Sequence, residues 1–102
     1  MLKQFDIIAA PAGQNFPYMV VLQSDMLQDL ATRIACPMVD TTQVPSPSLL
    51  WPKVALNNTQ YVVLVPRMLS ISADPNATAV ANLGALGDAL QQAINLVFQP
   101  PE

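Results

Sequence analysis

The hydrophobic period of the sequence changes near residue 82, and this change constrains the fold more than any other feature. From there to residue 98, apolar residues recur at spacings of three and four, the pattern of an amphipathic helix: Leu83, Leu86, Leu90, Ile94 and Val97. Polar residues share the opposite arc: Asp88, Gln91, Gln92, Asn95 and Gln99. Gly84 and Gly87 weaken the first turns, and Pro100-Pro101 makes Gln99 the expected last residue. One helix face should therefore pack on the protein, and the other should meet water or a partner.

Short runs rich in β-branched and aromatic residues precede this helix and predict strands. The runs are residues 3–9, 18–23, 33–39, 54–57, 61–65 and 69–73. The loop APAGQNFP predicts a hairpin between the first two runs, and NNTQ predicts a tighter turn between 54–57 and 61–65. The sequence therefore predicts an α+β fold that is mainly β, with an antiparallel sheet of about five strands and a C-terminal α-helix.

Prolines limit two further segments. Pro37 lies inside the run 33–39, and because proline cannot donate a ladder hydrogen bond, we expect this strand at an edge, at an end or with a bulge. Residues 40–52, DTTQVPSPSLLWP, are too apolar for a flexible linker and too broken for a regular element. We expect an ordered loop there, anchored by Trp51.

The composition indicates one domain with a protein partner. The chain has 102 residues, which we assign to a single domain at 1–102. Only 11 % of its residues are charged, against about 25 % in ordinary soluble domains, so apolar surface is expected to meet a partner. No run reaches the ~18 apolar residues of a membrane span, and Asp6 interrupts the apolar start, which argues against a secretion signal. We expect a cytoplasmic protein.

Charge and residue types exclude several kinds of chemistry. The net charge is −3, and the cations are Lys3, Arg33, Lys53 and Arg67, so direct nucleic-acid binding by this chain alone is not expected. The chain has no histidine, which is the commonest general base and metal ligand. We therefore expect no metal site, no cofactor and no histidine-dependent triad.

Several single residues have both a structural and a functional interpretation. Ser24 and Asp25 in LQSDML are either turn residues that bond the local backbone or contact residues. Arg33 and Arg67 with a nearby aspartate would suit metal-free phosphodiester cleavage, but solvated strand ends explain them equally well. Asn95, in the middle of the helix, is either solvated or a contact. Cys36, the only cysteine, is expected to be a small buried hydrophobe.

Two pieces of the sequence together resemble the CcdB family of plasmid toxins: VVLQSDML at residues 20–27 and AINLVF at 93–98. Further pieces follow that family's order and approximate spacing: QF near the start, Arg33–Val39, PKVALNN and RMLSIS. The resemblance implies a homodimer with an SH3-like antiparallel barrel sheet and a long C-terminal helix, a fold shared with the MazF and Kid ribonuclease toxins. It also implies a toxin–antitoxin system.

For CcdB-like proteins the implied activity is poisoning rather than catalysis. Such a dimer binds the A subunit of DNA gyrase and traps this topoisomerase on cleaved DNA, and a cognate CcdA-like antitoxin neutralises it. Residues carried over from the matching pieces form the expected gyrase-binding set: Ser24, Met26, Leu27, Asn95, Phe98 and Gln99. No catalytic residue, cofactor, metal or membrane contact is implied.

The sequence departs from this family at the end of the helix. The family's helix ends in a Trp-Gly-Ile tail that matters for gyrase poisoning, whereas this chain has Gln99, Pro100, Pro101 and Glu102 there. This difference leaves two alternatives open. One is a MazF-type endoribonuclease that uses Arg33 or Arg67 with an aspartate such as Asp25. The other is a degenerate, non-toxic family member that still binds an antitoxin.

Overall fold

A computed structural model describes residues 2–10, 13–23, 32–44, 48–72 and 78–98. These residues form seven strands and one α-helix: β1 (Asp6–Ala9), β2 (Tyr18–Val21), β3 (Thr32–Asp40), β4 (Lys53–Leu56), β5 (Thr59–Val63), β6 (Leu69–Ser72), β7 (Ala81–Asn82) and α1 (Gly87–Phe98). Short 3₁₀ helices lie at Thr41–Gln43, Val65–Arg67 and Gly84–Leu86. The predicted fold class, mainly β with a C-terminal helix, is confirmed.

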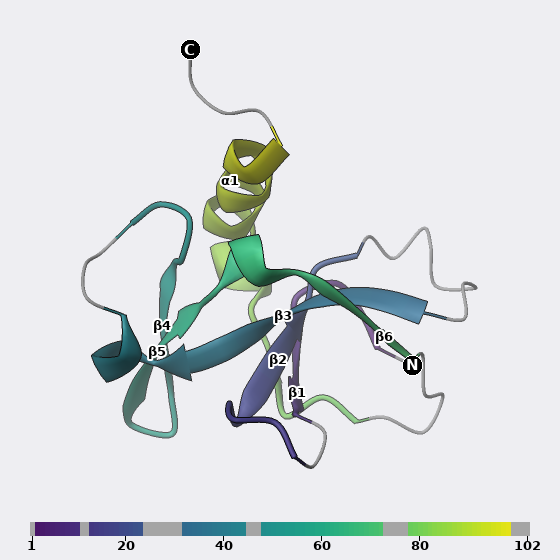
Figure 1. Cartoon of the computed structure of the whole chain (residues 1–102), viewed down its shortest axis with the longest axis vertical. Helices are drawn as coiled ribbons and strands as arrows, with labels where there is room; N and C mark the ends of the chain where they lie inside the picture. The colour runs from purple at the N-terminus through teal and green to yellow at the C-terminus, as the bar shows by residue number, and fades with distance from the viewer. Residues whose placement is uncertain (1, 11–12, 24–31, 45–47, 73–77, 99–102) are drawn as a thin grey trace.

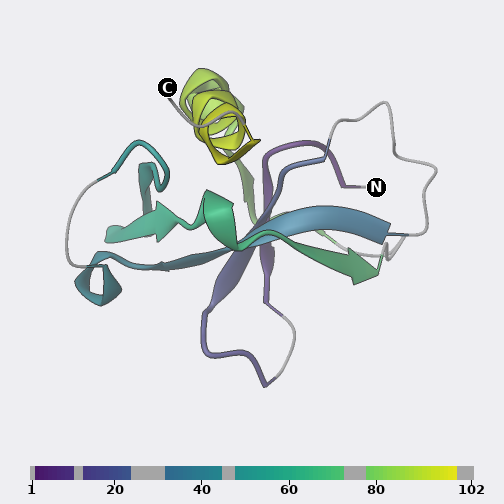
Figure 2. The same ribbon diagram turned by 45° about the horizontal axis from the view of Figure 1, so that its top comes forward.

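The described strands belong to one antiparallel sheet. Its hydrogen-bonded order is β4-β5-β3-β2-β1-β7, and β6 pairs with β3 beside this path. The sheet curls into a half-barrel in which the long strand β3 spans the view, with β6 beside one end and β4 and β5 at the other (Figure 1). Helix α1 lies over one face of the curled sheet (Figure 2). The other face of β1, β2 and β3 is therefore turned away from the helix.

Strand β1 begins at Asp6, three residues later than predicted. The reason is a turn in which the Lys3 amide donates to the Asp6 carboxylate at 2.7 Å and the Asp6 amide donates to the Lys3 carbonyl at 3.1 Å. Phe5 has a left-handed φ of 69° in this turn, which a strand cannot accommodate. The predicted hairpin is confirmed, because β1 pairs with β2 through Ile7 opposite Val20.

Strand β3 runs through the centre of the sheet, so the prediction of an edge, an end or a bulge at Pro37 is wrong. On one side of β3, residues 32–35 pair with β6 and residues 38–40 pair with β5, and Pro37 falls in the gap between them. A strand residue points its N–H and C=O to the same side. The Pro37 carbonyl accepts from the Leu64 amide at 2.9 Å. The Pro37 nitrogen, which carries no hydrogen, therefore faces the same side, where the neighbour of β3 changes from β6 to β5.

The hairpin between β4 and β5 turns on two asparagines. Asn57 and Asn58 have φ values of 51° and 66°, and Leu56 is paired with Thr59. Two consecutive left-handed residues define a tight turn whose twist matches the flanking strands, and asparagine tolerates this conformation better than most residues. The turn is confirmed, and Thr59 and Gln60 belong to β5 rather than to the loop.

The loop after β3 is held at both described ends. Asp40 accepts a hydrogen bond from the Thr42 amide at 2.8 Å, which lowers the pKa of the Asp40 carboxyl below its ordinary value. Trp51 packs with Phe16 and Val44 against a small cluster on the far side of the sheet: Val39, Val62 and Leu64. The prediction that Trp51 anchors this segment is confirmed, and residues 45–47 lie outside the described part.

Helix α1 begins at Gly87, later than the apolar pattern that starts near residue 82. Residue 82 belongs to β7, and a 3₁₀ helix at 84–86 precedes α1. Asn82 causes this delay, since its Oδ1 accepts from the Gly84 amide at 2.7 Å while its Nδ2 donates to Asp6 at 2.8 Å. Gly87 avoids a tight contact where α1 starts, because a Cβ there would lie 3.3 Å from the Phe5 ring.

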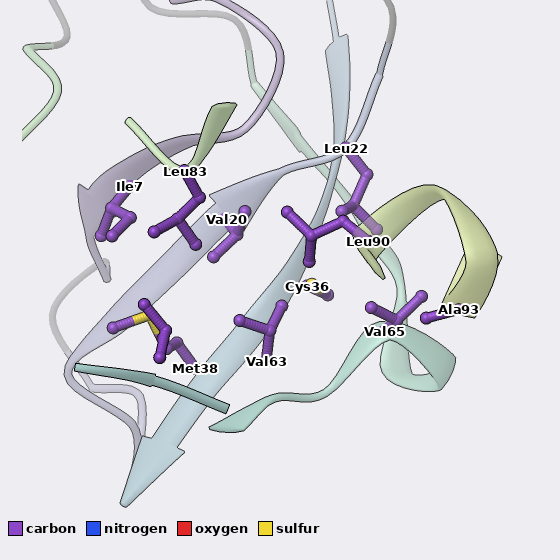
Figure 3. Close-up of a cluster of buried hydrophobic side chains, with 11 residues drawn as sticks. Ile7, Val20, Leu22, Cys36, Met38, Val63, Val65, Leu83, Leu90 and Ala93 are labelled. Atoms are coloured by element: carbon purple, nitrogen blue, oxygen red, sulfur yellow. The ribbon is translucent and has the colours of Figure 1, made fainter. Parts of the chain in front are cut away.

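The main core lies between α1 and the concave side of the sheet (Figure 3). The buried residues of this cluster come from most strands and from the helix: Ile7, Val20, Leu22, Cys36, Met38, Val54, Val63, Val65, Leu83, Leu90 and Ala93. Figure 3 shows Val65, in the 3₁₀ helix after β5, beside Ala93 of α1. The predicted helix face is confirmed, since Leu83 and Leu90 are buried here and Leu86, Ile94 and Val97 pack against the cluster.

Candidate functional site

The outer face of α1 carries the polar residues predicted for it. Asp88, Gln91, Gln92 and Asn95 are exposed. Gln91 Nε2 donates to Asn95 Oδ1 at 3.2 Å, and the two residues are one helical turn apart. Among the described residues, none accepts a hydrogen bond from Asn95 Nδ2. This amide can therefore donate to a partner molecule.

Phe98 is the most exposed large apolar side chain of the described residues, at 69 %. It follows Ile94 by four positions, so both side chains lie on the same side of α1. Leu90 and Ala93 are fully buried on the face toward the sheet, which leaves Ile94 at the margin of the core. Because burying a phenylalanine stabilises a contact by roughly 1.5 to 3 kcal/mol, Phe98 is a strong candidate anchor for a partner protein.

An apolar groove runs from Phe98 to the edge of the sheet. It has a volume of about 470 Å³, and α1, the end of β2, β3 and β6 all contribute to its lining: Leu22, Gln23, Ile34, Met68, Leu69, Ser70, Ile94 and Phe98. Gln23 is fixed there because its Oε1 accepts from the Ile34 amide at 3.1 Å. We call this surface the helix groove.

The helix groove joins the two sequence pieces that carried the family resemblance. Leu22 and Gln23 belong to VVLQSDML, and Ile94 and Phe98 belong to AINLVF, although about seventy residues separate the two pieces. Four expected contact residues lie outside the described part: Ser24, Met26, Leu27 and Gln99. Of the expected set, the structure places Asn95 on the outer helix face and Phe98 at the groove.

Of the described residues that line the helix groove, the expected contact set contained only Phe98. The sequence interpretation gave no contact role to the other seven: Leu22, Gln23, Ile34, Met68, Leu69, Ser70 and Ile94. Ile34 and Ser70 lie opposite each other on β3 and β6, so strand pairing brings them to the groove. The sequence indicated a strand at residues 69–73. It did not indicate which strand would be its neighbour.

The two arginines occupy different environments. Arg33 is only 5 % exposed, and its guanidinium donates to the Thr32 carbonyl at 3.2 Å. The interpretation of Arg33 as a solvated strand end is therefore wrong. Arg67, at the end of the 3₁₀ helix Val65–Arg67, is exposed as expected. Asp25 lies outside the described residues.

Cys36 is a buried core residue, as predicted. Its side chain has no exposed surface, and this burial raises the pKa of the thiol to about 12. A thiol with such a pKa stays protonated near neutral pH and is a poor nucleophile.

The described residues lack two further features. No group of three or more His, Cys, Asp or Glu side chains is placed there to hold a metal ion. None of the helices in this part of the chain has the length and apolar character needed to cross a membrane.

Comparison with solved structures places the fold among toxins. An endoribonuclease from a mycobacterial species, solved in complex with its cognate antitoxin, has a TM-score of 0.78 and 10 % sequence identity, and the match covers 100 % of this chain and 99 % of that one. The Mycobacterium tuberculosis toxin MazF-mt6 has a TM-score of 0.70 and 16 % identity, with 95 % and 99 % covered. Identities this low establish a shared fold alone.

Comparison of the sequence itself gives a family. No curated protein sequence matches the chain. In contrast, the sequence model of the CcdB protein family matches residues 4–100. This match spans nearly the whole length, including every strand, α1 and both pieces that line the helix groove. The chain therefore belongs to the CcdB family.

Proposed function

We propose that this chain is the toxin of a type II toxin–antitoxin system and that it poisons DNA gyrase in the cytoplasm. The observation that carries the proposal is the family match along residues 4–100. The chain binds the A subunit of gyrase and holds the topoisomerase on cleaved DNA. It acts by protein contact and not as a catalyst. A cognate CcdA-like antitoxin neutralises it.

The helix groove and the outer end of α1 form the gyrase-binding surface in this proposal. Phe98 supplies an exposed aromatic anchor, and Asn95 supplies an amide donor one turn earlier. Exposed aromatic side chains that become buried dominate many protein interfaces, and their loss typically costs ~2 kcal/mol or more. The remaining proposed contacts are Ser24, Met26, Leu27 and Gln99.

The chain acts as a homodimer in this proposal. The low charged fraction of the chain supports an interface between copies. A stable dimer buries on the order of 1,200 to 2,000 Å² in total. Light scattering at micromolar concentration should give about twice the 11.0 kDa chain mass, and a monomer would contradict this part of the proposal.

Gyrase-mediated DNA cleavage tests the proposed activity. Purified chain is added to gyrase and supercoiled DNA, and linear DNA is measured after denaturation of the enzyme. We expect the wild-type chain to increase the amount of cleaved DNA. The apparent affinity of the Phe98→Ala variant for gyrase, measured from its concentration dependence, should be at least ~30-fold lower. Leu49→Ala is the matched control, because Leu49 is 63 % exposed but does not line the groove.

Two results of this assay would count against the proposal. One is a wild-type chain, folded and dimeric, that leaves gyrases from several bacteria unaffected. The other is equal loss of cleavage in Phe98→Ala and Leu49→Ala, because it would show that the helix groove is not the contact. Asn95→Arg places a bulky charge on the outer face of α1 and should also weaken cleavage without unfolding the chain.

The endoribonuclease alternative rests on the fold shared with the mycobacterial enzyme. The burial of Arg33 counts against it, because a buried guanidinium is poorly placed to contact an RNA phosphate. Cleavage of a long RNA by the purified chain, abolished by Arg67→Ala, would replace the gyrase proposal with this one. A chain that binds an antitoxin but affects neither gyrase nor RNA would be a non-toxic family member.

A further inference from the structure

Met68 differs from the other described methionines in its access to water. Met19 and Met38 are at most 1 % exposed, whereas Met68 is only partly buried. Met68 directly follows the 3₁₀ helix Val65–Arg67 and precedes the exposed Leu69 at the start of β6. Of the methionine side chains in the described part of the chain, Met68 is therefore the one that a reagent dissolved in water can reach in the folded protein.

Met68 also lies where two surfaces of the protein meet. It lines the helix groove together with Ile94 and Phe98 of α1, and it lines a neighbouring hollow of about 430 Å³ beside Arg67. The same side chain packs against the main core. The Met68 thioether thus belongs partly to the fold and partly to the surface that we propose for gyrase binding.

The helix groove around Met68 is poor in polar groups. Among its described lining residues, only Gln23 and Ser70 have polar side chains, and Gln23 Oε1 accepts from the Ile34 amide at 3.1 Å. A polar atom added to Met68 would face water in the free chain. It would lose that water once a partner protein covered the groove.

Cys36, the other sulfur-containing side chain of this core, does not compete for an oxidant. It has no exposed surface, and burial raises the pKa of its thiol to about 12. Oxidants attack the thiolate form of cysteine, which is scarce at such a pKa. A thioether has no proton to lose, so its oxidation in the folded chain depends on access alone.

We propose that Met68 is a site of reversible oxidation, at which a peroxide converts the thioether to a sulfoxide and so weakens gyrase binding at the helix groove. This role rests on the proposed gyrase function. In the reaction the sulfur attacks one peroxide oxygen, so an S–O bond forms and the O–O bond breaks. The sulfur gives up two electrons, and the second oxygen leaves as water with both peroxide protons. The product is a polar and chiral side chain in place of a flexible apolar one.

The sulfoxide should affect binding more than folding. In the free chain its oxygen can turn toward water, because Met68 is only partly buried. In the complex the oxygen is covered, and burial of a polar group without a hydrogen-bond partner is unfavourable. We expect the apparent affinity for gyrase to fall about 5- to 100-fold. The urea midpoint of the free chain should change little.

Peptide mass mapping tests the modification itself, independently of gyrase. The full-length chain is treated with dilute hydrogen peroxide, and the mass of one added oxygen is followed over time at each methionine. Met68 should gain oxygen well before Met19 and Met38. Equal rates at these three positions, or oxidation of Met68 only after unfolding, would overturn the proposal.

Gyrase-mediated DNA cleavage then compares the reduced and the oxidised chain. The control variant is Met68→Leu, which has a similar side-chain volume but no sulfur and leaves every other methionine in place, including Met26. Each protein is compared with its own untreated sample. Peroxide should lower the apparent affinity of the wild type but not that of Met68→Leu. Treatment with the two methionine sulfoxide reductases, one for each sulfoxide epimer, should restore the wild type.

Several results would contradict this role of Met68. Equal affinity before and after its oxidation would overturn the inference and leave the gyrase proposal intact. Equal peroxide losses in wild type and Met68→Leu would assign the effect to another methionine. A lower solution mass after oxidation would place the thioether between two copies, and a lost circular dichroism signal would make its role structural; either would overturn the inference. If the reduced wild type leaves gyrase unaffected, the proposed function fails and this inference fails with it.

Discussion

Replacing Leu90 by alanine tests whether α1 is held by the core that the structure assigns to it. Leu90 has no exposed surface and lies in the cluster between the helix and the sheet. Leucine-to-alanine changes at buried sites cost about 2 to 5 kcal/mol, and the cost rises with the cavity left behind. Because Leu90 is enclosed by sheet residues on one side and its own helix on the other, we expect about 3 to 5 kcal/mol.

Two further substitutions provide reference values for the stability that Leu90→Ala loses. Ile94 is only partly buried and lines the helix groove, so Ile94→Ala should cost less than Leu90→Ala, roughly 1 to 2 kcal/mol. Leu49 is 63 % exposed, and Leu49→Ala should change the unfolding free energy by no more than about 0.5 kcal/mol. The expected order is therefore Leu90, then Ile94, then Leu49.

Urea denaturation followed by circular dichroism measures these losses, at one fixed protein concentration because dimerisation would add to stability. A domain of this size has an unfolding free energy of about 5 to 15 kcal/mol, so Leu90→Ala should lower the midpoint strongly without changing the urea slope. Its thermal midpoint should fall by at least ~10 °C. If Leu90→Ala unfolded within 1 kcal/mol of the wild type, the packing of α1 on the sheet would be wrong.

Three more predictions concern the thiol, the hairpin and the end of the helix. Because burial raises the pKa of the Cys36 thiol to about 12 from its ordinary value of 9.0, this burial favours the folded state fully below about pH 9. The contribution is lost as the pH rises from there toward 12. A thiol reagent at pH 8 should therefore label Cys36 only after denaturation, and rapid labelling of the native protein would contradict its burial. Asn58→Val should cost about 1 to 2 kcal/mol in urea unfolding because Asn58 has a φ of 66°, whereas Asn58→Gly should be nearly neutral; equal effects would show that the left-handed turn is absent. Replacing residues 99–102 by Trp-Gly-Ile should raise apparent gyrase affinity at least ~30-fold in the DNA cleavage assay, because a buried tryptophan contributes ~2 kcal/mol or more; no gain by this chimera, with its dimer intact, would count against gyrase as the target.

Local patterns predicted the elements of the fold well where one physical cause dominated. The spacing of Leu83, Leu90 and Ile94 gave the helix its buried face, because helical periodicity brings such positions together whatever they pack against. Asn57 and Asn58 gave the hairpin turn, since asparagine adopts left-handed conformations readily. The family resemblance added the barrel-like sheet and directed attention to Asn95 and Phe98.

Predictions failed where a residue's environment came from a distant segment. Pro37 suggested an edge strand, but β3 is central because its neighbour changes from β6 to β5 where the proline lies. Arg33 suggested a solvated strand end, but it is buried in the curled sheet. Asn82 lay at the start of the predicted helical segment. Its hydrogen bonds to Asp6 and Gly84 hold it in strand β7 instead, so the helix begins later in the chain.

The sequence alone thus determined the fold class, the amphipathic helix, the tight hairpin and membership of a toxin family, because these depend on local conformational preference and on order along the chain. Only the tertiary structure decided which side chains share a surface. Leu22 and Phe98 are 76 positions apart, yet both line the helix groove because β2 ends beneath the last turns of α1. Phe16 and Arg67 likewise line one hollow of the protein. Curvature and strand order arise from packing of the whole core, so no local pattern encodes either surface.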